Sequence, residues 1–136
     1  MDNSPPDFAA LALVRAFCAA WDRLDLDAAL AMLADDVHYH NIPMPALDGI
    51  AAVEAYLRQA AAFDSAAWEI VVIAATGSTV LTERVDRFLM NGQPIALPVM
   101  GTFEVRGGKI AAWRDYFDLA DYQRQLAAAA AAGKAA

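Results

Sequence analysis

The second half of the chain consists of apolar segments separated by glycine-containing turns, and this pattern constrains the fold most. Four such segments, rich in β-branched and apolar residues, cover residues 68–73, 80–90, 95–105 and 109–117. They are joined at Gly77-Ser78, Asn91-Gly92 and Gly107-Gly108. Dipeptides of this kind are typical of tight turns between antiparallel strands. We therefore predict four successive strands in an antiparallel meander.

The first half of the chain has a helical period instead. Apolar residues recur at helical spacing at Phe8, Leu11, Val14, Phe17, Cys18 and Trp21. Two prolines precede this first predicted helix, and Asp7 is its candidate N-terminal cap. A second helix is predicted over residues 28–33, with Leu30 and Leu33 facing inward, and Asp35-Asp36 at its end.

A strand, a loop and a further helix connect these helices to the meander. Residues 37–41 form a predicted strand, and residues 42–45 must form a loop because their two prolines cannot donate to a strand ladder. Gly49 starts a third predicted helix, and residues 119–132 form a final alanine-rich one. Helices followed by a curled sheet predict an α+β fold.

Length, composition and charge limit the class of protein. The 136 residues favour one domain over residues 1–136, with flexible ends at 1–6 and 133–136. Hydrophobic residues make up 59% of the chain, which allows a sizeable core, and no apolar run approaches the roughly 20 residues of a membrane span. The net charge of -7 argues against nucleic acid as a partner. The single cysteine, Cys18, excludes an intramolecular disulfide, and the acidic N-terminus lacks the basic segment of a secretory signal. We therefore expect a cytoplasmic protein that binds neither nucleic acid nor membrane.

Charged residues inside two of the predicted strands mark a candidate site. On the strand over residues 80–90, alternation places Thr82, Arg84, Asp86 and Phe88 on one face. Arg84 and Asp86 then stand roughly 7 Å apart along the strand, so the guanidinium reaches the carboxylate and keeps donors for a second one. Asp115 is the candidate second carboxylate, because it shares a face with Trp113 and Phe117. A carboxylate on an aromatic face requires a partner or a chemical role.

Each of these residues also has a structural interpretation. Arg84 and Asp86 on an arbitrary strand form an ordinary ion pair. Tyr39 and Asn41 on the strand over residues 37–41 are a partly buried phenol and a polar residue at a strand end. His38 and His40 form a His-x-His pair that can bind a metal, although they face away from Tyr39 and Asn41.

Three segments resemble the limonene-1,2-epoxide hydrolase family in their residues, order and spacing: residues 39–43 (YHNIP), 82–86 (TERVD) and 108–118 (GKIAAWRDYFD). The similarity extends from the first helix to Asp118. It implies the cone fold of the nuclear-transport-factor-2-like (NTF2-like, SnoaL-like) superfamily, in which a curved, mixed six-stranded sheet and three to four helices enclose a deep pocket. The family is usually dimeric and uses neither cofactor nor metal, which implies a homodimer here.

The resemblance also implies site residues. The Asp-Arg-Asp triad of the family falls on Asp86, Arg84 and Asp115, and its two water-positioning residues fall on Tyr39 and Asn41. The implied substrate-binding residues are Phe88, Leu97, Val99, Phe117 and Trp113, and Cys18 and Trp21 are expected at the border of the pocket.

The implied activity is the addition of water to a small, mostly apolar epoxide of the terpene or cycloalkene type, giving a vicinal diol in one step without a covalent intermediate. Asp115 takes a proton from a water held by Tyr39 and Asn41, and Asp86 delivers a proton to the epoxide oxygen. Arg84 bridges both carboxyls, and burial and like charge favour one proton shared between them. Two other classes remain open on this fold: a proton-transfer enzyme of the ketosteroid isomerase or polyketide cyclase type, and a non-catalytic module that binds apolar ligands.

Overall fold

A computed structural model describes residues 6–135. The chain opens with two helices and returns to helix twice more: α1 (Pro6–Asp22), α2 (Leu26–Ala31), α3 (Ile50–Ala60) and α4 (Leu119–Ala135). The strands are β1 (Leu33–Asn41), β2 (Leu47–Asp48), β3 (Ser65–Thr76), β4 (Thr79–Met90), β5 (Gln93–Arg106) and β6 (Lys109–Tyr116).

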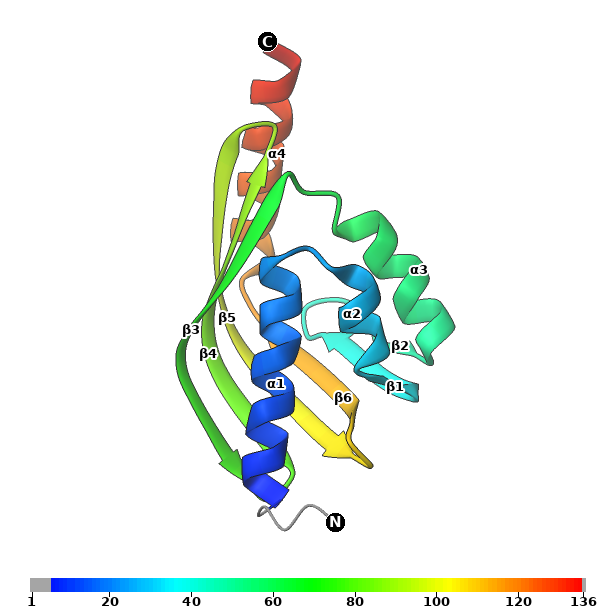
Figure 1. Ribbon diagram of the computed structural model, residues 1–136. Helices are drawn as coiled ribbons and strands as arrows, with labels where there is room; N and C mark the ends of the chain where they lie inside the picture. The colour runs from blue at the N-terminus through cyan, green and yellow to red at the C-terminus, as the bar shows by residue number, and fades with distance from the viewer. Residues whose placement is uncertain (1–5, 136) are drawn as a thin grey trace.

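The six strands form one sheet in the order β2-β1-β6-β5-β4-β3. β3 to β6 pair antiparallel in sequence, as the meander predicted, whereas β1 pairs parallel with β6 and makes the sheet mixed. The sheet curves strongly, and α1, α2 and α3 lie on its concave side (Figure 1). The predicted α+β class with a curved, mixed, six-stranded sheet and four helices is confirmed.

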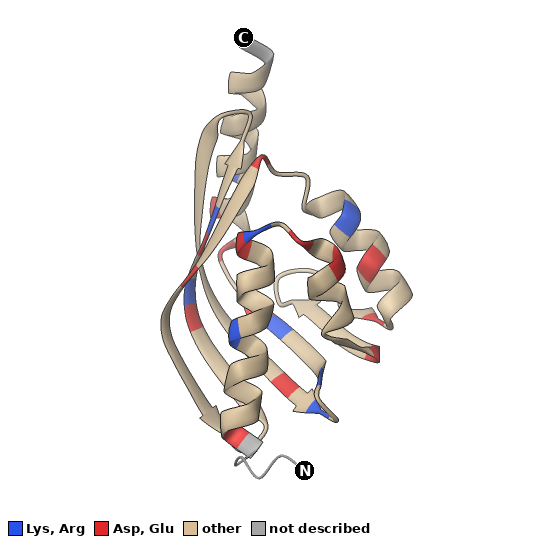
Figure 2. Ribbon diagram, in the orientation of Figure 1, with Lys and Arg blue, Asp and Glu red and all other residues tan. Residues whose placement is uncertain are grey.

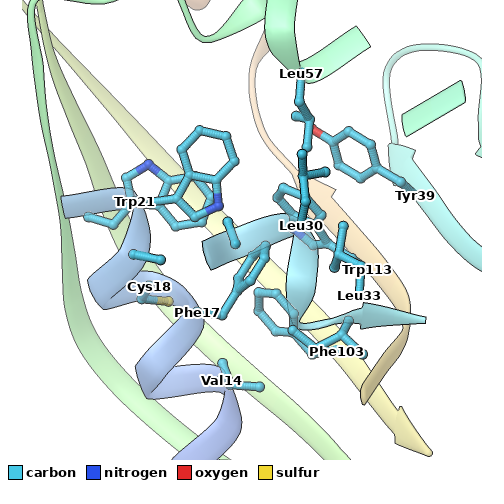
Figure 3. Packing of buried hydrophobic residues seen from close by; sticks show 14 of the residues in the cluster. Val14, Phe17, Cys18, Trp21, Leu30, Leu33, Tyr39, Leu57, Phe103 and Trp113 are labelled. Carbon is cyan, nitrogen blue, oxygen red and sulfur yellow. The ribbon is translucent and has the colours of Figure 1, made fainter. Parts of the chain in front are cut away.

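An aromatic core fills the space between α1 and the concave face. Phe17 of α1 makes edge-to-face contacts with Trp21, Trp68, Phe103 and Trp113 at centroid distances of 4.9 to 6.4 Å. Side chains of α1 point toward those of β5 and β6 (Figure 3). The indole N–H groups of Trp21, Trp68 and Trp113 are buried and have no hydrogen-bond partner among the described residues. Packing rather than hydrogen bonding therefore holds this core together.

The second helix and the first strand differ from the prediction. α2 starts at Leu26 because the Asp25 carboxylate caps it by accepting from the Ala28 N–H. Leu33 lies in β1 rather than in the helix, where it pairs with Ile110, and it is buried as predicted. Asp35 and Asp36 lie within the strand at an irregularity in its pairing with β6, which lets both acidic side chains stay exposed.

Differences at the other helices and at β2 are smaller. α1 starts at Pro6, since proline is tolerated in a first helical turn, so Asp7 lies inside the helix and not at its cap. β2 has only two residues and was not predicted. α4 continues to Ala135, past the predicted end at 132, and Gly133 packs against Asn91 of the β4–β5 turn. The predicted flexibility of 1–6 and 133–136 is untested, and residues 1–5 and 136 lie outside the described residues.

Charged residues of both signs are spread over the helices and strands (Figure 2). Most ion pairs are exposed, such as Arg87 with Glu69 at 3.0 Å. Over residues 6–135, no helix combines the length and apolar character that a membrane crossing needs.

Candidate active site

Three neighbouring strands place a charged cluster on the concave face. The alternation of β4 buries Thr82, Arg84 and Asp86, which are 1%, 1% and 4% exposed. Asp115 of β6, 5% exposed, stands two strands away, and Gly101 of β5 lies in register with both Thr82 and Asp115. The sheet register therefore brings together the three residues that the sequence predicted as a triad.

Arg84 bridges the two carboxylates with all of its hydrogen-bond donors. Its Nε and Nη2 donate to Oδ1 and Oδ2 of Asp86 at 3.0 and 2.9 Å. Its Nη1 and Nη2 donate to Oδ1 and Oδ2 of Asp115 at 3.2 and 3.0 Å. Nη1 also donates to Oγ1 of Thr82 at 3.1 Å. All five guanidinium N–H groups are thus satisfied, which fixes the orientation of both acids.

Gly101 is required by this close packing. A Cβ at this position would lie 2.3 Å from Nη1 of Arg84, 2.7 Å from Oδ1 of Asp115 and 2.9 Å from Oγ1 of Thr82. Hydrogen bonds join these three atoms to one another, so a Cβ at this position would disturb at least one of those bonds. The sequence analysis missed this residue, although a lone glycine inside a predicted strand is a known signal of a close approach.

Aromatic rings and burial set the electrostatics of the cluster. The Arg84 guanidinium lies 4.5 Å from the ring centroid of Trp68 and 5.8 Å from that of Phe103. Burial lowers the pKa of Arg84, but the charges of Asp115 and Asp86 outweigh burial and keep that pKa above its ordinary value. Burial raises the pKa of Asp86 to about 6, although the Arg84 charge and hydrogen bonds act in the opposite direction. Asp86 is therefore suited to hold a proton near neutral pH.

β1 brings a phenol and an amide to the same place. Because β1 runs parallel to β6, Asn41 lies in register with Asp115 and Tyr39 with Trp113. The Tyr39 hydroxyl donates to Oδ1 of Asn41 at 3.1 Å. Burial, and then the charge of Asp115, raise the pKa of Tyr39 well above its usual range, so the phenol stays neutral. This bond uses the Asn41 side-chain oxygen and leaves its amide nitrogen available as a donor, on a residue in register with Asp115.

These groups open onto a cavity of about 450 Å³ between the sheet, α3 and α4, a size typical of small-molecule sites. Its lining consists of Trp21, Tyr39, Asn41, Met44, Tyr56, Leu57, Gln59, Ala60, Ala61, Ala62, Phe63, Asp86, Phe88, Met90, Leu97, Val99, Asp115, Phe117, Leu119, Tyr122, Gln123 and Leu126. Both carboxylates of the cluster, the phenol and the amide therefore line one mostly apolar cavity.

The structure places most of the predicted pocket residues at this cavity. Phe88, Leu97, Val99 and Phe117 line it, and so does Trp21. Trp113 lies elsewhere: it is 1% exposed and stacks on the far side of the Tyr39 ring at 4.0 Å, so it supports Tyr39 and does not face the cavity. Cys18 is buried in the core, where burial raises its thiol pKa to about 12.

The sequence analysis missed the contribution of the helices to the cavity. α4 supplies Leu119, Tyr122, Gln123 and Leu126, which follow helical spacing i, i+3, i+4 and i+7. That period is present in the sequence, but the alanine-rich composition suggested only a packing helix. α3 supplies Tyr56, which was not assigned to the pocket from the sequence.

The two histidines lie outside the cavity. Nδ1 of His38 and Oδ1 of Asp48 are 2.6 Å apart, and Nε2 of His40 is 2.8 Å from the carbonyl oxygen of Met44. These contacts tie β1 to β2 and to the loop after β1. Within the described part of the chain, no three His, Cys, Asp or Glu side chains gather in a set that could hold a metal ion.

Comparison with known proteins shows the family of this chain. The family described as the limonene-1,2-epoxide hydrolase catalytic domain matches residues 8–128. Epoxide hydrolase EphG of Mycobacterium tuberculosis (strain ATCC 25618 / H37Rv) is 35% identical over 113 residues, which cover 83% of this chain and 76% of that protein.

Two solved structures share the fold closely. The structure of an M. tuberculosis LEH-like epoxide hydrolase has a TM-score of 0.80 and 34% sequence identity, and the match covers 94% of this chain and 96% of that one. A candidate polyketide cyclase from Xanthomonas campestris pv. campestris also has a TM-score of 0.80, with 28% identity over 89% of this chain and 98% of that one.

Proposed function

Because this chain belongs to the limonene-1,2-epoxide hydrolase family, we propose that it adds water to a small, mostly apolar epoxide and releases a vicinal diol. The observation that supports this reaction best is the bridge from Asp86 through Arg84 to Asp115, whose two carboxylates face one apolar cavity. The terpene or cycloalkene type of substrate is part of the proposal, because the cavity lining is mostly apolar.

In the proposed mechanism, the neutral Tyr39–Asn41 pair holds a water molecule against Asp115. As the water oxygen bonds to one epoxide carbon, the bond from that carbon to the epoxide oxygen breaks. Asp115 accepts a proton from the attacking water, and protonated Asp86 donates its proton to the departing oxygen. The product is a neutral diol, and one proton moved back from Asp115 to Asp86 restores the starting state.

The electrostatics of the cluster support these roles. An acid and a base must be present together, and burial favours one proton within the pair. Because the pKa of Asp86 is raised to about 6, this carboxyl is suited to carry the proton that the proposal delivers to the epoxide oxygen. Arg84 holds both groups in place while the charge moves between them.

Oxygen labelling tests the one-step mechanism. A single turnover in water enriched in heavy oxygen is expected to place one labelled oxygen in the diol, because no enzyme oxygen enters the product. Label transferred to Asp86 or Asp115 would instead indicate an ester intermediate.

Substitution of the acids tests the assignment of roles. Asp86→Asn and Asp115→Asn are each expected to lower kcat about 100- to 10,000-fold, the range of one general acid or base. Circular dichroism and thermal melting check that the fold is kept. If either variant retains near-native turnover, that residue has no part in the mechanism. Dialysis against a chelator is expected to leave the rate unchanged, because the proposal assigns no step to a metal.

The likeness to a candidate polyketide cyclase favours one second function, proton transfer next to a carbonyl on the same cavity. Asp115 or Asp86 serves as the base in that case, and the Arg84 bridge has no evident role. Proton exchange on a cyclic ketone, followed by nuclear magnetic resonance in deuterated water, distinguishes the two reactions. Fast exchange without any epoxide turnover supports the second function.

We also propose that the protein is a homodimer that pairs through the outer face of the sheet. Val72, Met100 and Tyr116 are 56%, 54% and 46% exposed and stand in one row across the strands, with Glu83 between Val72 and Met100; Leu81, 51% exposed, lies on the same face. Exposed apolar patches of this kind mark protein interfaces. Light scattering is expected to give twice the mass of one chain, and a Met100→Glu substitution is expected to give monomers.

A further inference from the structure

Two tyrosines in the cavity have no role in the proposed hydrolysis. Tyr56 of α3 and Tyr122 of α4 both line the cavity and are half-buried. The Tyr56 ring lies 6.0 Å from Tyr39, and the Tyr122 ring lies 6.0 Å from Phe117 and nearly perpendicular to it. Each phenol is thus held beside a wall residue of the site but belongs to a helix, not to the sheet.

The Tyr122 hydroxyl is open to the cavity. Over residues 6–135, buried polar side-chain atoms without a partner occur only on the three core indoles, so this hydroxyl is not sealed in the protein. No hydrogen bond joins it to another described residue. Tyr122, Tyr56 and Asp86 line the same cavity, and burial raises the pKa of Tyr122 to about 12, with smaller contributions from Tyr56 and Asp86. Tyr122 therefore offers a neutral O–H donor inside an apolar pocket.

Polar groups in the cavity are arranged by depth. Asp86 and Asp115 are deepest, at 4% and 5% exposed. Tyr56 and Tyr122 are half-buried, and the glutamines of the same two helices that line the cavity are exposed. A bound epoxide placed against the carboxylates therefore shares the cavity with both phenols.

The half-buried polar groups of the cavity, Tyr56 and Tyr122, are uncharged. The charged side chains in the described lining are the two acids, Asp86 and Asp115, and no lysine or arginine faces the cavity. Arg84 lies behind them, with every donor already paired. A carboxylate on the substrate would meet no cation there, whereas a neutral oxygen can accept a hydrogen bond from a phenol.

We propose that Tyr122, together with Tyr56, binds a second, uncharged oxygen of the substrate, so that this enzyme prefers epoxides that also carry a hydroxyl, ether or carbonyl group remote from the epoxide. This inference rests on the proposed function and narrows its substrate class. A pure hydrocarbon epoxide displaces water from the phenols and returns no hydrogen bond, which disfavours its binding.

Matched pairs of substrates test the inference. The epoxide of α-terpineol and that of the hydrocarbon p-menthene share one carbon skeleton and differ by one hydroxyl. Further pairs place the hydroxyl at increasing distance from the ring. kcat/KM is measured for each pair with the wild type, Tyr122→Phe, Tyr56→Phe and, as a control, Tyr116→Phe on the outer face of the sheet.

At least one pair is expected to show a preference of about three- to tenfold for the hydroxylated member, as for one neutral hydrogen bond. The Tyr122→Phe variant is expected to reduce that ratio toward one, whereas Tyr116→Phe leaves it unchanged. No preference in any pair, or a preference that survives both cavity substitutions, overturns the inference. An equal loss of rate on both members in Tyr122→Phe also overturns it, because the phenol then acts at the epoxide itself.

The same experiment distinguishes failure of the proposed function from failure of the inference about the phenols. If the wild type hydrolyses no member of any pair, the hydrolase proposal falls, and dissociation constants of the same intact compounds replace kcat/KM. Quenching of tryptophan fluorescence reports binding because Trp21 lines the cavity. The same ratios between paired compounds and between variants then decide whether the phenols bind a second oxygen.

Discussion

The charged cluster and the tryptophan core behind it are buried to the same extent but satisfy their polar groups in opposite ways. Every N–H of Arg84 has an acceptor, whereas the indole N–H groups of Trp21, Trp68 and Trp113 have none among the described residues. A buried charge without partners costs far more than a buried indole N–H. The fold therefore places its buried acceptors at the guanidinium and holds the indoles by packing.

Replacing the planar guanidinium of Arg84 is expected to have the largest effect on activity and stability. Arg84→Lys keeps the charge but leaves an ammonium that cannot hold two carboxylates in parallel pairs. We expect kcat/KM to fall at least about 100-fold and the free energy of unfolding to fall by about 3–5 kcal/mol, as when a buried pair loses a partner. Urea titration and epoxide turnover measure these effects.

Arg87→Lys is the matched control for this substitution. Arg87 lies on the same strand but on the outer face, where its ion pair with Glu69 is half-exposed. The expected change in unfolding free energy is within about 0.5 kcal/mol. If both substitutions change the free energy of unfolding equally, the buried cluster contributes no more to stability than the exposed ion pair.

Crowding the cluster is expected to have the next largest effect. Gly101→Ala introduces a Cβ 2.3 Å from the Arg84 Nη1, so the guanidinium must shift away from at least one carboxylate. We expect a loss of about 1–3 kcal/mol in unfolding free energy, typical of overpacking, together with a large loss of activity. Thr102→Ala, at the next position of β5, is the control. Wild-type turnover in Gly101→Ala would show that the arrangement tolerates movement.

The raised pKa of Asp86 predicts a moderate dependence on pH. Its folded pKa of about 6 lies above the ordinary value of 3.8, so the folded state binds this proton more tightly than the unfolded state. The contribution of Asp86 to stability is therefore complete below about pH 4 and is lost as the pH rises to about 6. Activity that depends on protonated Asp86 is expected to fall about tenfold per pH unit above its pKa. The free energy of unfolding, measured across this pH range, should lose the part of its pH dependence that is due to Asp86 in the Asp86→Asn variant. An unchanged pH profile in that variant would contradict the assignment.

Substitution in the tryptophan core is expected to have the smallest effect. Trp68→Phe removes an indole N–H that has no partner in the described part of the chain, while a ring remains beside Arg84. Lost packing and the removal of an unsatisfied donor act in opposite directions, so we expect a net destabilisation of about 1–2 kcal/mol. A loss above about 3 kcal/mol in urea titration would indicate that the indole nitrogen makes a bond after all.

The sequence predicted the parts of this fold that depend on local pattern. Strand alternation placed Arg84 and Asp86 on one buried face, and glycine-containing turns located the β3 to β6 meander. The likeness of three short segments to one family then indicated that Asp115, Tyr39 and Asn41 belong to the same site. The family and the fold class are confirmed, while the catalytic roles stay predictions.

The features that the sequence did not predict depend on contacts between segments that lie far apart in the chain. Leu33 belongs to β1 because Ile110, far along the chain, offers it a strand partner. Trp113 was expected at the pocket, but strand alternation predicts only the face of the sheet on which a residue lies and not its distance from the cavity. In the structure the Tyr39 ring stacks on Trp113, and Tyr39 lines the cavity instead. Gly101 becomes necessary only when Arg84 and Asp115 approach it from two strands.

Because β1 pairs parallel with β6, the site is complete only when this pair of strands has formed. Asn41 and Asp115 come from opposite ends of the chain and meet only when β1 has docked beside the last strand. A meander formed by residues 65–116 alone already contains Arg84 and both acids, yet it lacks Tyr39 and Asn41, which are proposed to hold the water. If Tyr39 and Asn41 hold the water as proposed, turnover requires that β1 has paired with β6.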